Sequence, residues 1–237
     1  LVRDDAFLDS DPLSSNRAVD WGYHSYRNSD IATYVHAIEW LVEQGVWILR
    51  MGKIMEKPFP SQHEHIIDYA FCPDRSDLLD IWLFANCTGC ISTGSGLDAV
   101  SYLYDKPIIY LNYSPLTNLI SAHESITAPK HLIWSKHKET LSLRQYLENG
   151  YLQTQKYTEA GIEIVDLDSE EILEAVQEFW HRIQGNWHVD KEDIYRQRRF
   201  WQIFRTWADY DKSHGWVHPN SFVGTHFLKN IGAAFFE

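Results

Sequence analysis

The stretch from Cys90 to Asp98, with the sequence CISTGSGLD, constrains the fold of this chain more than any other part of it. An apolar run leads into it, two glycines flank Ser95, and a helix-compatible run follows. This order predicts a strand, a tight loop and a helix. Backbone N–H groups in such a loop can approach an anion, and the following helix adds its positive end. A turn without a ligand is the alternative. We expect this loop to bind the phosphates of an activated substrate, and its candidate substrate-binding residues are Ser92, Thr93, Gly94, Ser95, Gly96 and Asp98.

The segments around this loop predict a parallel sheet. Apolar residues from 31 to 42 recur at helical spacing, Gly45 provides a helix stop, and 46–50 is an apolar strand. Helix and strand patterns then alternate as far as residue 112. Such units build parallel sheets with helices on both faces, so we predict an α/β, Rossmann-like fold. The further elements are strands at 66–70, 89–92 and 108–111 and helices from Ser76 and at 97–105.

The second half of the chain carries weaker patterns. A capping box at 168–171 starts a helix that should end near Ile183. We expect a Rossmann-like domain over 1–167 and a helical C-terminal extension over 168–237. The remaining expectations are loop structure at 4–29, irregular structure at 113–138, helices at 140–149, 151–160 and 190–210, and a last strand at 162–165.

Charge and cysteine content exclude several classes of protein. The net charge is −12, from 33 acidic and 21 basic residues, which argues against a general nucleic-acid-binding protein. The three cysteines, Cys72, Cys87 and Cys90, are too few for a disulfide framework and favour a reducing, cytoplasmic location. No apolar run approaches the length of a membrane span. The glycine loop lacks the P-loop lysine and the full dinucleotide fingerprint.

Basic and acidic residues follow several predicted strands. Arg3 closes an apolar stretch, and Arg50 and Gly52 follow another, so both arginines are candidates to clamp a diphosphate. A surface arginine at a strand end is the alternative for Arg50. Asp77 could accept from a ribose or sugar hydroxyl, or it could be an acid favoured in the first turn of a helix. The histidines are scattered, and we expect no metal site.

Four motifs together resemble a family of predicted bacterial glycosyltransferases encoded among surface-polysaccharide genes, with a more distant similarity to fucosyltransferase-like enzymes. The resemblance covers residues 1–167, and the tail around Gly224 to Asn230 is similar to the end of that family. One departure is that Leu1 stands where the family commonly has histidine. The motifs are Tyr26-Arg27-Asn28-Ser29-Asp30, Arg50-Met51-Gly52, Arg75-Ser76-Asp77 with Asp80-Ile81, and Ile91 to Asp98.

The resemblance implies a GT-B-like fold whose Rossmann-like domain binds a nucleotide diphosphate sugar. Arg3 and Arg50 would then face the diphosphate and residues 93–96 would surround it. The expected reaction is metal-independent transfer of the sugar to a hydroxyl group of a glycan or other acceptor, with no cofactor. Asp4, with Asp5 beside it, is the candidate base. Residues 1–3 read as the end of a strand, so we also expect upstream sequence, including an acceptor domain.

Two other functions remain open from the sequence. A nucleotide-sugar epimerase of GT-B-like type would need acid and base carboxylates in the cleft. A non-catalytic nucleotide-sugar-binding or assembly module is the third possibility, and the Trp- and Arg-rich segment near 195–207 would suit contact with a protein partner or second domain.

Overall fold

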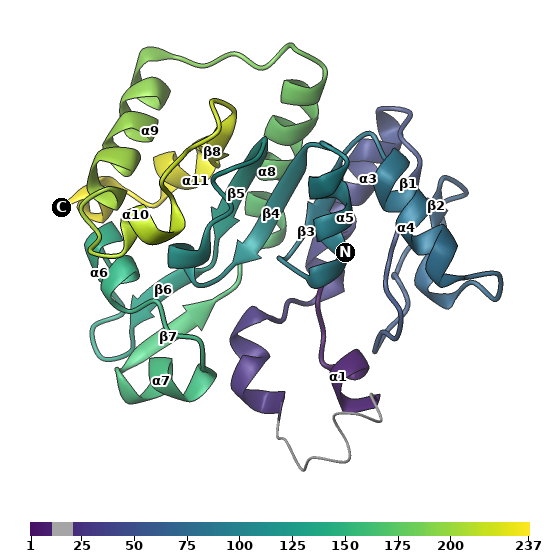
Figure 1. The fold of residues 1–237 in the computed structure, drawn as a ribbon, viewed down its shortest axis with the longest axis horizontal. Helices are drawn as coiled ribbons and strands as arrows, with labels where there is room; N and C mark the ends of the chain where they lie inside the picture. Colours follow the sequence, from purple (N-terminus) through teal and green to yellow (C-terminus); the bar gives the residue numbers. More distant parts are fainter. Residues whose placement is uncertain (11–20) are drawn as a thin grey trace.

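A computed structural model describes residues 1–10 and 21–237 of the chain, which form a mixed α/β fold around a four-stranded parallel sheet (Figure 1). The strand order is β3-β4-β5-β8, and all three pairings are parallel. The sequence prediction of a parallel sheet flanked by helices is therefore confirmed. The strands are β3 (Cys90–Ser92), β4 (Ile108–Tyr113), β5 (Ser125–Pro129) and β8 (Ser221–Val223).

The central strand β4 shows how the sheet is covered. Ile108, Ile109 and Leu111 are fully buried. Ile109 and Leu111 pack in the large core cluster with residues of α3 and α8, whereas Ile108 and Tyr110 pack in a smaller cluster with Phe84 of α4. Successive side chains of a strand point to opposite faces, so helices cover the sheet on both sides. This burial explains why the strand reads as a continuous apolar run.

Local signals define the longer helices. Ser76 caps α4 by accepting a hydrogen bond from the N–H of Leu79, and Asp168 caps α8 through the N–H groups of Glu170 and Glu171. Gly45 follows α3 with a φ of 80°. The α-helices are α1 (Ala6–Ser10), α3 (Val35–Glu43), α4 (Asp77–Asn86), α5 (Ala99–Leu103), α6 (Leu143–Glu148), α7 (Thr154–Glu159), α8 (Ser169–Ile183), α9 (Lys191–Phe204), α10 (Tyr210–Ser213) and α11 (Thr225–Asn230).

Short 3₁₀ segments connect these elements, and two small sheets flank the main one. Parallel pairing joins β1 (Ile48–Leu49) to β2 (Ile66–Ile67), and antiparallel pairing joins β6 (His131–Trp134) to β7 (Ile162–Val165). Within the described residues, no helix is both long and apolar enough to cross a bilayer. The 3₁₀ segments are η1 (Trp21–Arg27), η2 (Ile31–Tyr34), η3 (Tyr69–Phe71), η4 (Gly96–Asp98), η5 (Leu116–Asn118) and η6 (Ala233–Phe236).

Several sequence predictions need correction in the first half of the chain. The expected loop at 4–29 contains α1 and η1; its residues 11–20 lie outside the described part. The segment 113–138, expected to be irregular, contains β5 and β6. β5 was missed because all five of its residues are buried, so the hydroxyl-bearing sequence SITAP shows no alternation. The strands expected at 46–50 and 66–70 each shorten to two residues, which pair with one another outside the main sheet.

The C-terminal segment also differs from the prediction. It is not wholly helical, because β8 pairs in parallel with β5 in the register Ile126 to Phe222. Residues 162–165 are therefore not the last strand, and they belong to the small antiparallel sheet. The helix expected over 190–210 ends at Phe204, and α10 is a separate turn. The helix from 169 to 183 has the predicted bounds.

Candidate functional site

The loop after β3 is organised by the carboxylate of Asp98. Its Oδ2 accepts hydrogen bonds from Ser92 Oγ at 2.5 Å and from the N–H of Ser95 at 2.8 Å. Ser92 Oγ in turn accepts from the N–H of Gly94 at 3.0 Å. Burial raises the pKa of the Asp98 carboxyl, although these hydrogen bonds oppose the shift. The loop therefore takes its shape from bonds between its own residues.

Leu1 and Arg3 form hydrogen bonds to Thr93 of the loop. The N–H of Thr93 donates to the carbonyl of Leu1 at 3.2 Å, and Thr93 Oγ1 accepts from the N–H of Arg3 at 3.0 Å. The amides of three successive residues, Thr93, Gly94 and Ser95, are thus already hydrogen-bonded within the protein. An anion at this loop would have to exchange these bonds or use other donors, so phosphate binding by these amides stays a prediction.

Gly94 requires the absence of a side chain. Its φ is +78°, a conformation that residues with a Cβ rarely adopt. An added Cβ would also lie 2.7 Å from Cε2 of Tyr113. The ring of Tyr113 is fixed from its other end, because its hydroxyl donates to the carbonyl of Asn118 at 2.6 Å. The first glycine of the loop therefore meets a requirement of the backbone.

Two arginines converge beside this loop. Arg27 donates through Nη2 to the carbonyl oxygen of Gly94, and Arg3 donates through Nε to Asn28 Oδ1 at 3.3 Å. Burial and then the charge of Arg27 lower the pKa of Arg3. Across residues 1–10 and 21–237 neither guanidinium forms an ion pair, and Nη2 of Arg3 is buried without a hydrogen-bond partner. Two like charges with so little compensation attract an anion.

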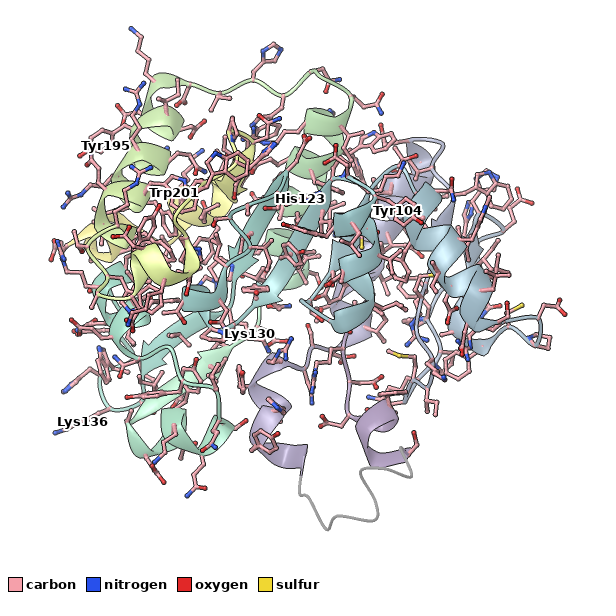
Figure 2. All side chains as sticks on the ribbon, in the orientation of Figure 1. Tyr104, His123, Lys130, Lys136, Tyr195 and Trp201 are labelled. Atoms are coloured by element: carbon pink, nitrogen blue, oxygen red, sulfur yellow. The ribbon has the colours of Figure 1, made fainter. Side chains whose placement is uncertain are left out.

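The segment that carries Arg27 is anchored to the sheet. Lys130 follows β5 and is buried, with 3% of its surface exposed. Its Nζ donates to the carbonyl of Asn28 at 2.5 Å and to Asp166 Oδ1 at 2.6 Å. Figure 2 shows Lys130 where the lower end of the sheet meets the N-terminal segments. On the other side, Thr154 Oγ1 accepts from the N–H of Tyr26 at 3.0 Å. These bonds fix Arg27 at the carboxyl-end edge of the sheet.

Arg50 lies in a different environment from the one proposed for a diphosphate clamp. It is 5% exposed, and its Nη1 is 3.1 Å from Asp68 Oδ1. Its Nη2 donates to the carbonyl of Lys57 at 2.9 Å, and the guanidinium lies over the ring of Phe71 at 5.4 Å. This side chain thus ties β1 to the loop that follows it.

Gly52 and Asp77, the other two residues predicted to bind substrate beside Arg50, have neighbours outside the glycine loop. A Cβ added to Gly52 would collide with the side chain of Met55. Asp77 is 77% exposed in the first turn of α4, with Lys53 Nζ 3.5 Å away. Among the described residues, no hydrogen bond or ion pair joins Asp77 to the glycine loop. Its position fits the helix-dipole alternative.

The two aspartates proposed as bases differ in their contacts. Asp4 Oδ1 accepts from the N–H of Ala6 at 3.1 Å, and its Oδ2 accepts from the N–H of Glu56 at 2.9 Å. Both oxygens of Asp4 therefore stabilise backbone structure. Asp5 Oδ1 is buried and has no hydrogen-bond partner in the described part of the chain. Its charge also interacts with Arg3.

Comparison of the chain with protein-family models, curated proteins and solved structures found no match. The family resemblance in the sequence therefore stays a prediction. Among the described residues, no cluster of three His, Cys, Asp or Glu side chains is arranged to hold a metal ion.

The arrangement adds one residue that the sequence reasoning did not single out. Arg27 belongs to the motif Tyr26–Asp30, which was noted without a role for its arginine. Its proximity to Arg3 depends on contacts with Thr154 and Lys130, more than 100 residues away in the sequence. The sequence feature that could have indicated a binding role for Arg27 is its position as a basic side chain within an aromatic and polar segment.

Proposed function

We propose that the chain binds the diphosphate of a nucleotide sugar at Arg3 and Arg27 and transfers the sugar to a hydroxyl acceptor, as a GT-B-like glycosyltransferase. The observation that carries this proposal is the convergence of Arg3 and Arg27 beside the loop that follows β3, where neither guanidinium has an ion-pair partner among residues 1–10 and 21–237. In open α/β sheets, ligands bind outside the carboxyl ends of the strands, where this pair lies.

The arginines would act on the leaving group. When the bond from the anomeric carbon to the phosphate oxygen breaks, its electron pair passes to the diphosphate, whose negative charge increases. Guanidinium groups that are already oriented stabilise this charge without reorganising. The bond between Arg27 and the Gly94 carbonyl, together with that between Arg3 and Asn28, provides such orientation.

The acceptor hydroxyl must lose its proton as its oxygen bonds to the anomeric carbon. Asp5 is our proposed base, because its Oδ1 is not occupied by another donor among the described residues. Asp4 stays a candidate from the sequence, but a role as base would require it to give up its contact with Ala6 or Glu56.

Calorimetric titration with GDP, UDP, CMP and dTDP sugars tests the proposal. We expect one nucleotide class to bind, and Arg27→Ala to weaken that binding at least about tenfold, equivalent to about 1.4 kcal/mol. Arg198→Ala, at an exposed position of α9, is the matched control and should leave the affinity unchanged. Thermal unfolding of each variant separates loss of binding from loss of folding.

The outcome also separates the alternatives. Sugar transfer to an acceptor, abolished by Asp5→Asn with binding retained, supports the transferase. A changed sugar in the absence of acceptor would point to an epimerase, and binding without turnover to a binding module. If no nucleotide sugar binds, or Arg27→Ala binds as tightly as the parent protein, the proposal is wrong.

A further inference from the structure

Helix α4 is apolar on every side, although it lies at the surface of the molecule. On its inner side, Leu79 and Phe84 pack in the smaller core cluster. On its outer side, Leu78 and Trp82 are 79% and 57% exposed, and Ile81 is exposed as well. These three residues are spaced three and four positions apart, so they share one face of the helix. A helix that is hydrophobic all round is normally buried on all sides, so the outer face of α4 has the composition of a covered surface.

Helix α5 extends this apolar surface. Ser101 Oγ of α5 donates to the carbonyl of Phe84 in α4 at 2.9 Å, and both helices contribute to the smaller core cluster. The two helices therefore cover the same face of the sheet, and their outer sides form one surface. At the end of α5, Leu103 and Tyr104 are exposed, and Figure 2 shows Tyr104 where α5 lies beside α4. We define the α4–α5 face as Leu78, Ile81, Trp82, Leu103 and Tyr104.

The α4–α5 face carries little uncompensated charge. The segment 81–104 contains a single charged residue, Asp98, which is buried in the glycine loop. At the start of α4, Asp77 has Lys53 Nζ 3.5 Å from its Oδ1, and Asp80 pairs with Arg75 at 2.5 Å. The whole chain has a net charge of −12, which repels a second copy and an anionic membrane alike. Two copies can therefore meet only where each presents a neutral surface, and this face is one.

The charges at the ends of α4 favour an antiparallel pairing of the helix with its own copy. A two-fold axis through Ile81 and Trp82 places the N-terminal end of each α4 beside the C-terminal end of the other, where the helix dipoles attract. Lys53, next to the start of one helix, then lies beside the carbonyl end of the second copy's helix, where a cation is favoured. The two Asp77 carboxylates are kept apart at opposite ends of the pair.

The size of the α4–α5 face fits an interface between two folded chains. A half-exposed leucine, isoleucine, tryptophan or tyrosine offers on the order of 100 Å² of mostly apolar surface, and the face has five such residues. A stable interface buries about 800 Å² per partner, of which about two thirds is apolar when two identical chains meet. The face therefore supplies most of the apolar area that a dimer of this kind needs.

We propose that the α4–α5 face joins two copies of this chain into a symmetric dimer in which the two α4 helices pack antiparallel. Ile81 and Trp82 lie at the two-fold axis, and Leu78, Leu103 and Tyr104 surround them. None of these residues belongs to the candidate site at Arg3 and Arg27, so the dimer is independent of the proposed function.

Analytical ultracentrifugation over a range of protein concentrations tests the proposal. We expect a monomer–dimer equilibrium, and Leu78→Glu should weaken association at least about tenfold because it places an unpaired charge in the interface. Leu152→Glu is the matched control, since Leu152 is also exposed but lies between α6 and α7. It should associate like the parent protein. A monomer at every concentration would overturn the proposal, as would Leu78→Glu associating as tightly as the parent.

Cysteine cross-linking tests the antiparallel arrangement. Under mild oxidation, Ile81→Cys should form a disulfide with its own copy, because position 81 lies at the two-fold axis. Leu78→Cys should not, because the two copies of position 78 are about 10 Å apart along the helices, beyond the reach of a disulfide. The parent protein, with its three native cysteines, gives the background. Cross-linking at position 78 and not at 81 would contradict the arrangement.

Thermal unfolding separates loss of association from loss of folding. Because Leu78 is exposed in the single chain, Leu78→Glu and Leu152→Glu should unfold at similar temperatures under conditions in which both are monomeric. If Leu78→Glu does not fold, Tyr104→Glu provides the same comparison from α5. A folded Tyr104→Glu that dimerises like the parent would then overturn the proposal.

Discussion

Arg50 and Asp68 form an ion pair in which Nη1 and Oδ1 are 3.1 Å apart and the arginine side chain is 4% exposed. The second oxygen of Asp68 accepts from the N–H of Phe59 at 2.6 Å. Together these contacts link the end of β1 to the loop after it. They engage the Arg50 guanidinium, which the sequence analysis proposed as a ligand for the diphosphate.

The first prediction separates these two roles of Arg50. Arg50→Ala leaves the Asp68 carboxylate without its cation, so we expect the free energy of unfolding to fall by about 3–5 kcal/mol. Nucleotide affinity of the folded variant should be unchanged. Urea unfolding and calorimetric titration measure the two quantities. Lys138→Ala, which removes a largely exposed ion pair with Glu163, should alter neither. If Arg50→Ala kept its stability but lost nucleotide affinity, the result would support the diphosphate-binding role for Arg50 instead.

The second prediction concerns the two glycines of the loop after β3. Gly94→Ala forces a Cβ into a left-handed conformation and against Tyr113, so it should lower stability by at least about 1–2 kcal/mol. Gly96→Ala is the matched control, because an added Cβ there meets no atom within 4 Å. Urea unfolding of both variants provides the comparison. Equal stability of the two alanine variants would show that the loop does not need its observed backbone conformation.

The third prediction is a pH dependence from Asp98. Burial raises its pKa above the ordinary value of 3.8, so the folded protein keeps this proton to a higher pH than the unfolded chain. The stability that this group contributes is full below pH 3.8 and is lost as the pH rises through the folded pKa. The unfolding free energy of the parent protein, relative to that of Asp98→Asn, should therefore fall over this window and then become constant. A difference that grows with pH would contradict the assignment.

The fourth prediction concerns Glu178, a fully buried carboxylate of α8. It accepts two hydrogen bonds from Arg182, at 2.9 and 2.7 Å, and two from Thr225, at 2.7 and 2.8 Å. Glu178→Ala should destabilise the fold by about 3–5 kcal/mol in urea unfolding, since the partners lose their acceptor in a buried site. Glu174→Gln, on the same helix and more exposed, should cost no more than about 1 kcal/mol. Similar losses for the two variants would argue against this role.

The longer helices α3, α4 and α8 could be predicted because their signals are local. The capping box at Asp168 and the apolar spacing after it define α8 to its last residue, Ile183. The glycine after α3 gives the end of that helix in the same way. These signals act between residues three or four positions apart, so the sequence contains them in readable form.

The strands that could not be predicted from the sequence depend on pairing between segments that are far apart in the chain. β5 and β8 have five and three residues, which is too few for a periodic pattern, and their register joins Thr127 to Val223. Nothing near either segment indicates that partner. The candidate site was predictable to the same limited degree: Arg3 and the glycine loop were found, but the approach of Arg27 depends on Lys130 and Asp166.

The late position of β8 in the sequence has a consequence for biosynthesis. β5 is complete at residue 129, but its neighbour on one side arrives only with residues 221–223. During synthesis on the ribosome, one edge of β5 therefore stays unpaired until β8 is made, and it can pair with another strand. A nascent chain cut short before residue 221 should therefore be prone to aggregation along this edge of β5.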